Sequence, residues 1–145
     1  MAKLKEKVTI GRSDIVDLPK LGIENIRAKV DTGAYRCSLH CKNVHVENGV
    51  LYFTVKMDSG SQEYATKEWS LKVVKSSNGK SQKRFVIKTH IRMFEKYYLA
   101  SISLADRSKM KNPLLIGRKV LTNKFVVDVS QKDLSYNQKK TEWTG

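Results

Sequence analysis

The sequence predicts an all-β protein, a barrel or sandwich built from many short strands. Several segments alternate apolar and polar residues, the pattern of a strand with one buried face. Turn signals such as Asn48-Gly49 and Asn78-Gly79 separate these segments at short intervals. No glycine-rich phosphate loop is present, and only residues 118–123 favour a helix, which is short. Closely spaced short strands of this kind are typical of all-β barrels and sandwiches.

The first part of the chain contains two predicted strands with a loop between them. Residues 8–10 are a short apolar strand, and residues 15–22 are a loop that contains a proline. Residues 26–30 are the second strand, because Ile26, Ala28 and Val30 share one side of an extended chain. This strand leads directly into a turn that begins at Asp31.

The middle and end of the chain continue as strands and turns. The predicted strands are 39–46, 51–57, 63–74, 84–93, 98–104, 114–117 and 125–129. A polar loop covers 105–112, and the short helix over 118–123 follows Gly117. Residues 131–145 are polar and are expected to form a tail or arm. With no internal repeat or linker, we expect residues 1–145 to form a single domain with a core of about residues 8–130.

Composition limits the location and partners of the protein. No apolar run approaches the roughly 20 residues that a membrane span needs, so no membrane partner is expected. The basic N-terminal segment is not followed by the apolar stretch of a signal peptide, which favours a cytoplasmic protein. Cys37 and Cys41 are then expected to be reduced thiols. The net charge of +14 favours anionic partners, although a merely solvated basic surface accounts for it as well.

The turn Asp31-Thr32-Gly33-Ala34 is the place where the chain could carry out chemistry. It places a carboxylate, a hydroxyl and a glycine that permits close approach of another backbone at the end of a strand. Taken alone, the same four residues are more simply interpreted as a loop in which the Asp side chain bonds its own backbone.

A later segment, Leu114-Leu115-Ile116-Gly117-Arg118, changes this balance. An Asp-Thr-Gly-Ala turn followed by a hydrophobic-Gly-Arg segment that enters a short helix resembles the retropepsin-like aspartic proteases. The resemblance is closer to a bacterial branch of them, named ATP-dependent zinc proteases, whose members accompany ATP-grasp ligases that add glutamates to protein tails. The segments that match, in order, are Ile10-Gly11, Leu18 to Gly22, Ala28 to Ala34, Ser38 to His40, Val86 to Thr89, Leu104 to Ser108, Met110, Pro113 to Arg118 and Phe125 to Ser130.

The resemblance implies a closed six-stranded barrel and an active site at the Asp31 turn. Asp31 would be the catalytic carboxylate, and Thr32 would hydrogen-bond across a dimer axis. Gly33 would let the substrate backbone approach, and Ala34 would pack beneath it and contribute to substrate binding.

A homodimer is implied because an aspartic protease needs two carboxylates that share one proton. The chain has one Asp-Thr-Gly, and Asp58-Ser59-Gly60 is better interpreted as a hairpin turn. The second carboxylate must then come from Asp31 of a second copy, across a twofold axis.

The resemblance also implies structural roles for Gly117 and Arg118. In retropepsins the arginine after the late glycine binds an acidic residue shortly after the Asp turn, but Tyr35 and Arg36 occupy those positions here. Asp106 and Asp128 are the alternative partners considered for Arg118, and a surface arginine at a helix end is the simpler interpretation. The hairpin turns at 57–61 and 76–79 are candidates for the flap that would close over a substrate.

Metal and nucleotide chemistry find less support in the residues. Cys37, His40, Cys41 and His45 are crowded and could bind zinc, but the spacing is not that of common zinc sites and there is no H-E-x-x-H. We therefore expect no metal ligands, with buried cysteines as the preferred interpretation. No phosphate-binding Gly-Lys-Ser/Thr loop is present, and no cofactor is expected.

Two function classes follow. The first is a dimeric aspartic peptidase that acts on acidic, glutamate-tailed peptides or proteins, which a basic protein would attract. The second is a non-catalytic basic β-barrel module that binds acidic tails or nucleic acid, although no nucleic-acid-binding motif is present.

Overall fold

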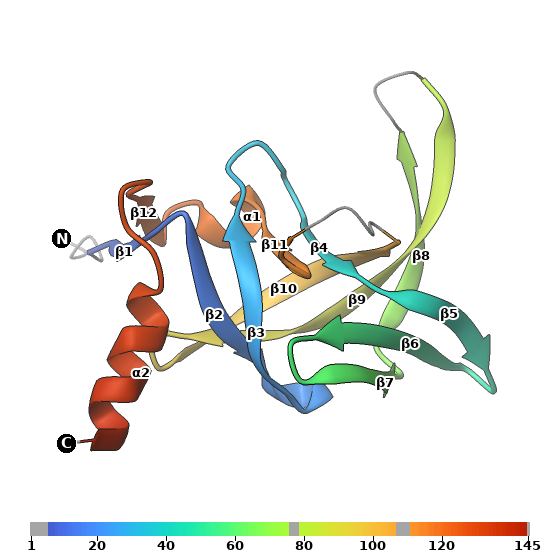
Figure 1. The fold of residues 1–145 in the computed structure, drawn as a ribbon. Helices are drawn as coiled ribbons and strands as arrows, with labels where there is room; N and C mark the ends of the chain where they lie inside the picture. Colours follow the sequence, from blue (N-terminus) through green and yellow to red (C-terminus); the bar gives the residue numbers. More distant parts are fainter. Residues whose placement is uncertain (1–5, 76–78, 107–110, 145) are drawn as a thin grey trace, which may run out of the picture.

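Six strands close into a barrel in the computed structural model, which describes residues 6–75, 79–106 and 111–144 (Figure 1). Hydrogen-bonded neighbours run in the order β10-β4-β11-β3-β2-β9, and β9 pairs again with β10 to complete the ring. The barrel strands are β2 (Ser13–Leu18), β3 (Ile23–Val30), β4 (Cys37–His40), β9 (Ser81–Met93), β10 (Lys96–Ala105) and β11 (Leu114–Ile116). The prediction of an all-β fold with a closed six-stranded barrel is confirmed.

The position of β11 determines what surrounds the turn after β3. Leu114 of β11 lies opposite Ala28 of parallel β3 on one side and opposite Leu39 of antiparallel β4 on the other. The chain passes from β3 to β4 through the Asp31 turn, so this turn must cross the end of β11. Two segments that are far apart in sequence are thereby brought together.

Alternating apolar residues fill the barrel, as their spacing predicts. The prediction for 26–30 is confirmed, since Ile26, Ala28 and Val30 are buried. Further fully or almost fully buried side chains come from every other barrel strand: Leu18, Cys37, Leu39, Ile87, Ile91, Met93, Ile102, Leu114 and Ile116. Together they form one hydrophobic core that holds the barrel strands in register.

The remaining elements lie against the barrel. They are β1 (Val8–Ile10), η1 (Pro19–Leu21), β5 (Lys42–Glu47), β6 (Val50–Met57), β7 (Gly60–Thr66), β8 (Trp69–Lys75), α1 (Arg118–Leu121), β12 (Phe125–Val127) and α2 (Leu134–Thr144). Strands β5, β6 and β7 form a separate antiparallel sheet, β8 extends the barrel sheet beyond β9, and β1 pairs with β12 in parallel. The short helix after Gly117 is α1, as predicted.

The predicted loop over 15–22 is wrong, because most of it belongs to β2 and η1. Two buried carboxylates, Asp14 and Asp17, hide the strand pattern. Both are satisfied by hydrogen bonds: Asp17 accepts the backbone N–H of Asn25 at 2.8 Å, and Asp14 accepts that of Ile15 at 2.8 Å. A polar residue with such partners can be accommodated in a buried strand.

Residues 131–145, expected to be a polar tail or arm, contain helix α2, which packs against β2 (Figure 1). Asp14 accepts the backbone N–H groups of Ser135 at 2.9 Å and Tyr136 at 3.1 Å. Lys139 reaches Asp17 at 3.1 Å. The helix is therefore held by polar contacts from β2 rather than by an apolar face of its own. No helix in the described ranges is long and apolar enough to cross a membrane.

Candidate active site

The turn after β3 is closed in part by the side chain of its own first residue. Asp31 Oδ1 accepts the backbone N–H of Gly33 at 3.0 Å, and the Asp31 carbonyl accepts the N–H of Ala34 at 3.3 Å. The simpler interpretation of the motif, as a turn closed by its own Asp side chain, is therefore correct for the local hydrogen bonding. Within the described residues no hydrogen bond reaches the other carboxylate oxygen, Oδ2.

Residues 116–119 hold this turn in place through backbone hydrogen bonds. Asp31 N–H donates to the carbonyl of Ile116 at 2.9 Å. Arg118 N–H donates to the carbonyl of Ala34 at 2.8 Å, and Lys119 N–H to that of Tyr35 at 2.9 Å. The bonds from Arg118 and Lys119 use N–H groups at the start of α1, which have no partner within the helix. The two segments that carry the resemblance therefore lie in direct contact.

Gly117 is required where β11 meets α1. A Cβ atom at this position would lie 2.5 Å from the carbonyl oxygen of Arg36 and 2.7 Å from that of Tyr35. Both contacts are with backbone atoms, which cannot move aside as a flexible side chain could. The absence of a side chain lets the Asp31 turn pack on the β11–α1 junction.

Arg118 binds the turn, and among the described residues it has no acidic partner. Its Nη1 donates to the carbonyl of Thr32 at 3.0 Å, and its guanidinium carbon lies 5.9 Å from the centre of the Tyr35 ring. The two guesses for its partner, Asp106 and Asp128, are both wrong: Asp106 lies 3.8 Å from His40, and Asp128 accepts bonds from Ser130 and Gln131, which lower its pKa. Tyr35 thus takes the place of the missing acid through a cation–π contact, which sequence reasoning did not foresee.

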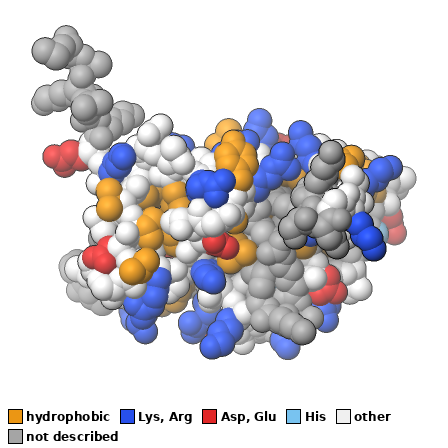
Figure 2. Space-filling view, turned by 90° about the horizontal axis from the view of Figure 1, so that it is seen from above, with side chains coloured by type: hydrophobic (Ala, Val, Ile, Leu, Met, Phe, Trp, Pro, Cys, Tyr) orange, Lys and Arg blue, Asp and Glu red, His pale blue; other side chains and the backbone are white. Residues whose placement is uncertain are grey.

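The surface of the turn is open. Thr32 and Gly33 are exposed, Asp31 and Ala34 are half-buried, and 56% of Tyr35 is exposed. Seen from this side of the molecule, Lys and Arg side chains are scattered around hydrophobic ones, with few acidic groups among them (Figure 2). Asp58 is not a second catalytic acid for this turn, because it lies in the β6–β7 hairpin and pairs with Arg27 at 2.9 Å.

The two flap candidates differ in position. The first, at 57–61, lies against β3 through the Arg27–Asp58 pair. The second falls on the tip of the β8–β9 hairpin, where residues 76–78 lie outside the described residues. The described arms of that hairpin extend to the same side of the barrel as the turn after β3 (Figure 1).

Cys37 and Cys41 are buried thiols rather than exposed nucleophiles. Burial raises the pKa of Cys37, partly offset by a hydrogen bond from the backbone of Gly117, and raises the pKa of Cys41 to about 12. Thiols of this kind stay protonated and are poor nucleophiles near neutral pH. In the described part of the chain, no three His, Cys, Asp or Glu side chains are close enough to hold a metal ion.

This barrel, with an Asp-Thr-Gly turn seated on a hydrophobic-Gly-Arg segment, defines a retropepsin-like protein. A sequence profile described as RimB-like, retropepsin-like aspartic endopeptidase RimB, matches residues 9–138. The chain belongs to this RimB-like family.

Curated relatives of the chain are named as ligases rather than as peptidases. A probable alpha-L-glutamate ligase of Shewanella pealeana is 31% identical over 133 residues, and one of Desulfotalea psychrophila is 28% identical over 130 residues. These matches cover 86% and 84% of this chain but only 29% and 28% of the relatives, so the chain spans less than a third of their length.

A solved structure has the same fold. A protein of unknown function from Legionella pneumophila superposes with a TM-score of 0.74 at 25% identity, over 90% of this chain and 99% of that one.

Proposed function

We propose that this chain is one half of an aspartic peptidase, in which two copies bring their Asp31 carboxylates together. The observation that carries the proposal is the fixed turn, held by backbone bonds from Ile116, Arg118 and Lys119 to residues 31–35. A rigid support of this kind is what a positioned catalytic carboxylate needs. Membership of the RimB-like family supports the same chemistry.

The chemistry requires the second copy. Two carboxylates a few ångströms apart cannot both ionise, so the pair retains one proton. The ionised Asp31 would remove a proton from a water molecule as it attacks the peptide carbonyl. The protonated Asp31 would donate a hydrogen bond to the carbonyl oxygen. One chain alone supplies one carboxylate and would be inactive.

Exposed apolar side chains beside the turn support a twofold interface there. Tyr35 is 56% exposed and Val129 is 73% exposed. Val129 lies close to the end of β3, because its carbonyl accepts a bond from Arg12 at 3.4 Å and the Arg12 carbonyl accepts the N–H of Val30 at 3.0 Å. Exposed apolar side chains in this region favour burial against a second copy.

The substrate class we propose is an acidic, glutamate-tailed peptide or protein. The chain carries 28 Lys and Arg against 14 Asp and Glu, a charge that attracts polyanions. Its relatives named as probable glutamate ligases support a role near glutamate-rich products.

The test compares cleavage by the wild-type protein with cleavage by Asp31→Asn. Both are incubated with a glutamate-tailed peptide and with the same peptide lacking the tail, and products are followed by mass spectrometry. We expect the wild type to cleave the tailed peptide and the variant to lose activity at least about 1000-fold, because the paired acid and base are both lost. Equal cleavage by both proteins would remove Asp31 from the mechanism.

A basic binding module without catalysis is the second candidate, favoured by the positively charged pocket described below. In that case the protein would bind acidic peptides or nucleic acid with a steep dependence on salt. Binding would be unchanged by Asp31→Asn, and no cleavage would occur.

A further inference from the structure

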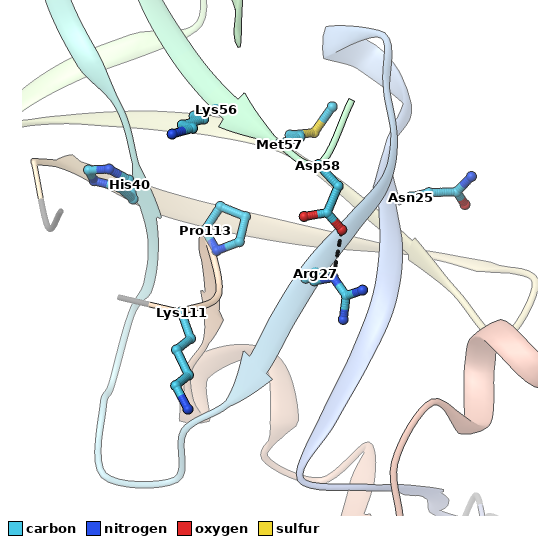
Figure 3. A pocket seen from close by; sticks show the side chains of 8 residues that line it. All are labelled: Asn25, Arg27, His40, Lys56, Met57, Asp58, Lys111 and Pro113. Carbon is cyan, nitrogen blue, oxygen red and sulfur yellow. Dashed lines mark hydrogen bonds and ion pairs between the residues drawn. The ribbon is translucent and has the colours of Figure 1, made fainter. Parts of the chain in front are cut away.

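A pocket with strongly basic walls lies on the outer face of the barrel beside β3. It has a volume of about 280 Å³, and its lining includes Arg27, His40, Lys56, Asp58, Lys111 and Pro113 (Figure 3). We call these six residues the basic pocket. The side chains come from β3, β4, the β6–β7 hairpin and the segment before β11, with Pro113 between them. Four separate segments thus place polar groups around one hollow.

The positive charge continues beyond the basic pocket. An adjoining cavity of about 350 Å³ shares His40 and Lys56 with it and adds Lys42. Among the described residues that line the two cavities, Asp58 is the one acidic residue, against Arg27 and three lysines. No ion pair in the described part of the chain neutralises Lys42, Lys56 or Lys111. An anion placed here would meet several cations whose charge is not already compensated.

Asp58 occupies the pocket in the way a bound carboxylate would. Its Oδ2 accepts a bond from Nε of Arg27 at 2.9 Å (Figure 3). Both side chains remain largely in solvent, 58% exposed for Arg27 and 82% for Asp58. Exposed ion pairs contribute little to folding, so a carboxylate from another molecule could replace Asp58 without a large cost.

The basic pocket is also placed along the strand that leads to Asp31. Arg27 and Lys29 are exposed on β3, whereas Ala28 and Val30 point into the barrel. Asp31 is the next residue after Arg27 and Lys29 in this series of alternate positions. At roughly 3.3 Å per residue, Arg27 lies about 13 Å and Lys29 about 7 Å before Asp31 along the strand. An extended acidic peptide held at Asp31 could therefore place carboxylates near both cations.

We propose that the basic pocket is a subsite for a side-chain carboxylate of an acidic peptide, with Asp58 bound to Arg27 only until that carboxylate replaces it. The inference rests on the proposed function for the class of ligand. It adds Arg27 and Lys56 as specificity-determining residues, with Lys111 and Lys42 contributing charge at the edges. Arg27 suits the role because its guanidinium can bind both oxygens of one carboxylate.

The test measures binding in the absence of cleavage. Fluorescent peptides of about five consecutive glutamates or, as the neutral control, glutamines are titrated into the Asp31→Asn protein. Arg27→Gln and Lys56→Gln are added to that background, with Lys96→Gln as the matched control. Lys96 is exposed and does not line either cavity, and its replacement removes the same single charge.

We expect Arg27→Gln and Lys56→Gln each to weaken glutamate-peptide binding about tenfold, since a charge-assisted bond is lost. Lys96→Gln should weaken it less than about twofold, because a distant exposed charge is screened. Arg27→Lys should recover part of the loss. An equal effect of all three neutral variants, or no effect of Arg27→Gln, would overturn the subsite, as would equal binding of the glutamine peptide.

Asp58→Asn tests whether the internal carboxylate competes with the peptide for Arg27. Removing the internal carboxylate should strengthen glutamate-peptide binding about threefold to tenfold, since Arg27 is then free. Weaker binding would show that Asp58 holds the pocket in shape rather than filling it, and would overturn that part of the proposal. Cleavage by the wild-type enzyme that does not depend on Arg27 would leave the peptidase and remove the subsite. Binding that depends on Arg27, without any cleavage by the wild-type enzyme, would leave the subsite and remove the peptidase.

Discussion

Gly117 lies where the backbone of residues 35 and 36 passes closest to the junction of β11 and α1. Its φ of −94° is one that any residue can adopt, so its requirement is spatial rather than conformational. The same residue donates a backbone bond to the buried Cys37 thiol. One glycine thus links the two segments that form the candidate active site.

Gly117→Ala should destabilise the protein by about 1–3 kcal/mol, because the new methyl group would force apart two stretches of backbone. We expect the shift to displace Asp31 and to reduce peptidase activity more than the loss of folded protein explains. Urea unfolding followed by circular dichroism measures the first effect, and cleavage per folded molecule the second.

Lys119→Ala, at an exposed position in α1, serves as the control for Gly117→Ala. It should leave stability within about 0.5 kcal/mol of the wild type, as most surface substitutions do. A fully stable and active Gly117→Ala protein would contradict the tight approach seen at Arg36.

The start of α2 is attached through one carboxylate on a strand far away in sequence. Asp14 accepts N–H groups from Ser135 and Tyr136 at the start of the helix, where such groups lack partners within the helix. Desolvation by burial raises the pKa of Asp14, and the bonds from Ser135, Ile15 and Tyr136 offset this in part. The helix is therefore joined to β2 through a group that titrates.

Asp14→Asn should cost about 1–3 kcal/mol at neutral pH, because an amide NH₂ would face a backbone N–H. The pKa of Asp14 is raised on folding, so the folded chain holds this proton more tightly than the unfolded chain. Its contribution to stability is complete below the unfolded pKa of about 4 and falls as pH rises through the folded value. The difference between wild type and variant should therefore shrink as pH increases.

Urea titrations of both proteins at several values between about pH 4 and pH 7 measure this trend. Taking the difference removes the effect of other carboxyl groups, which titrate alike in the two proteins. A difference that stays constant over the range, or grows towards neutral pH, would contradict the direction of the Asp14 shift.

At the scale of the whole molecule, the barrel leaves the Asp31 turn at an open surface with apolar side chains beside it. If two copies meet there, a charge placed next to the axis would face its own symmetry mate. Val129→Asp should convert a dimer into a monomer and abolish cleavage, because two buried like charges are strongly unfavourable. Light scattering after size exclusion measures the mass.

Val73→Asp is the matched control for Val129→Asp. Val73 is 64% exposed on β8, so the substitution adds the same charge at a similarly exposed valine. It should leave both mass and activity unchanged. A wild-type protein that remains monomeric at concentrations where it cleaves peptides would contradict the requirement for two copies.

Local patterns predicted an all-β barrel or sandwich because most strands bury one face, as β3 does with Ile26, Ala28 and Val30, and the family resemblance implied the closed six-stranded form. They failed at β2 and α2, where the stabilising contacts join Asp14 to Ser135 across 121 positions. No local signal reports such a partner. The Asp31 turn and Gly117 could be identified from the sequence through family resemblance. The Tyr35–Arg118 contact could not, since it replaces the usual acid with a different interaction.

The dependence of the Asp31 turn on Ile116, Arg118 and Lys119 has a consequence for synthesis. A ribosome delivers the turn before it delivers Ile116, Arg118 and Lys119, and domains generally fold as complete units. A growing polypeptide therefore carries the acid long before anything holds it in place. Under the proposed function, the peptidase would remain latent until both segments have been synthesised and have folded together.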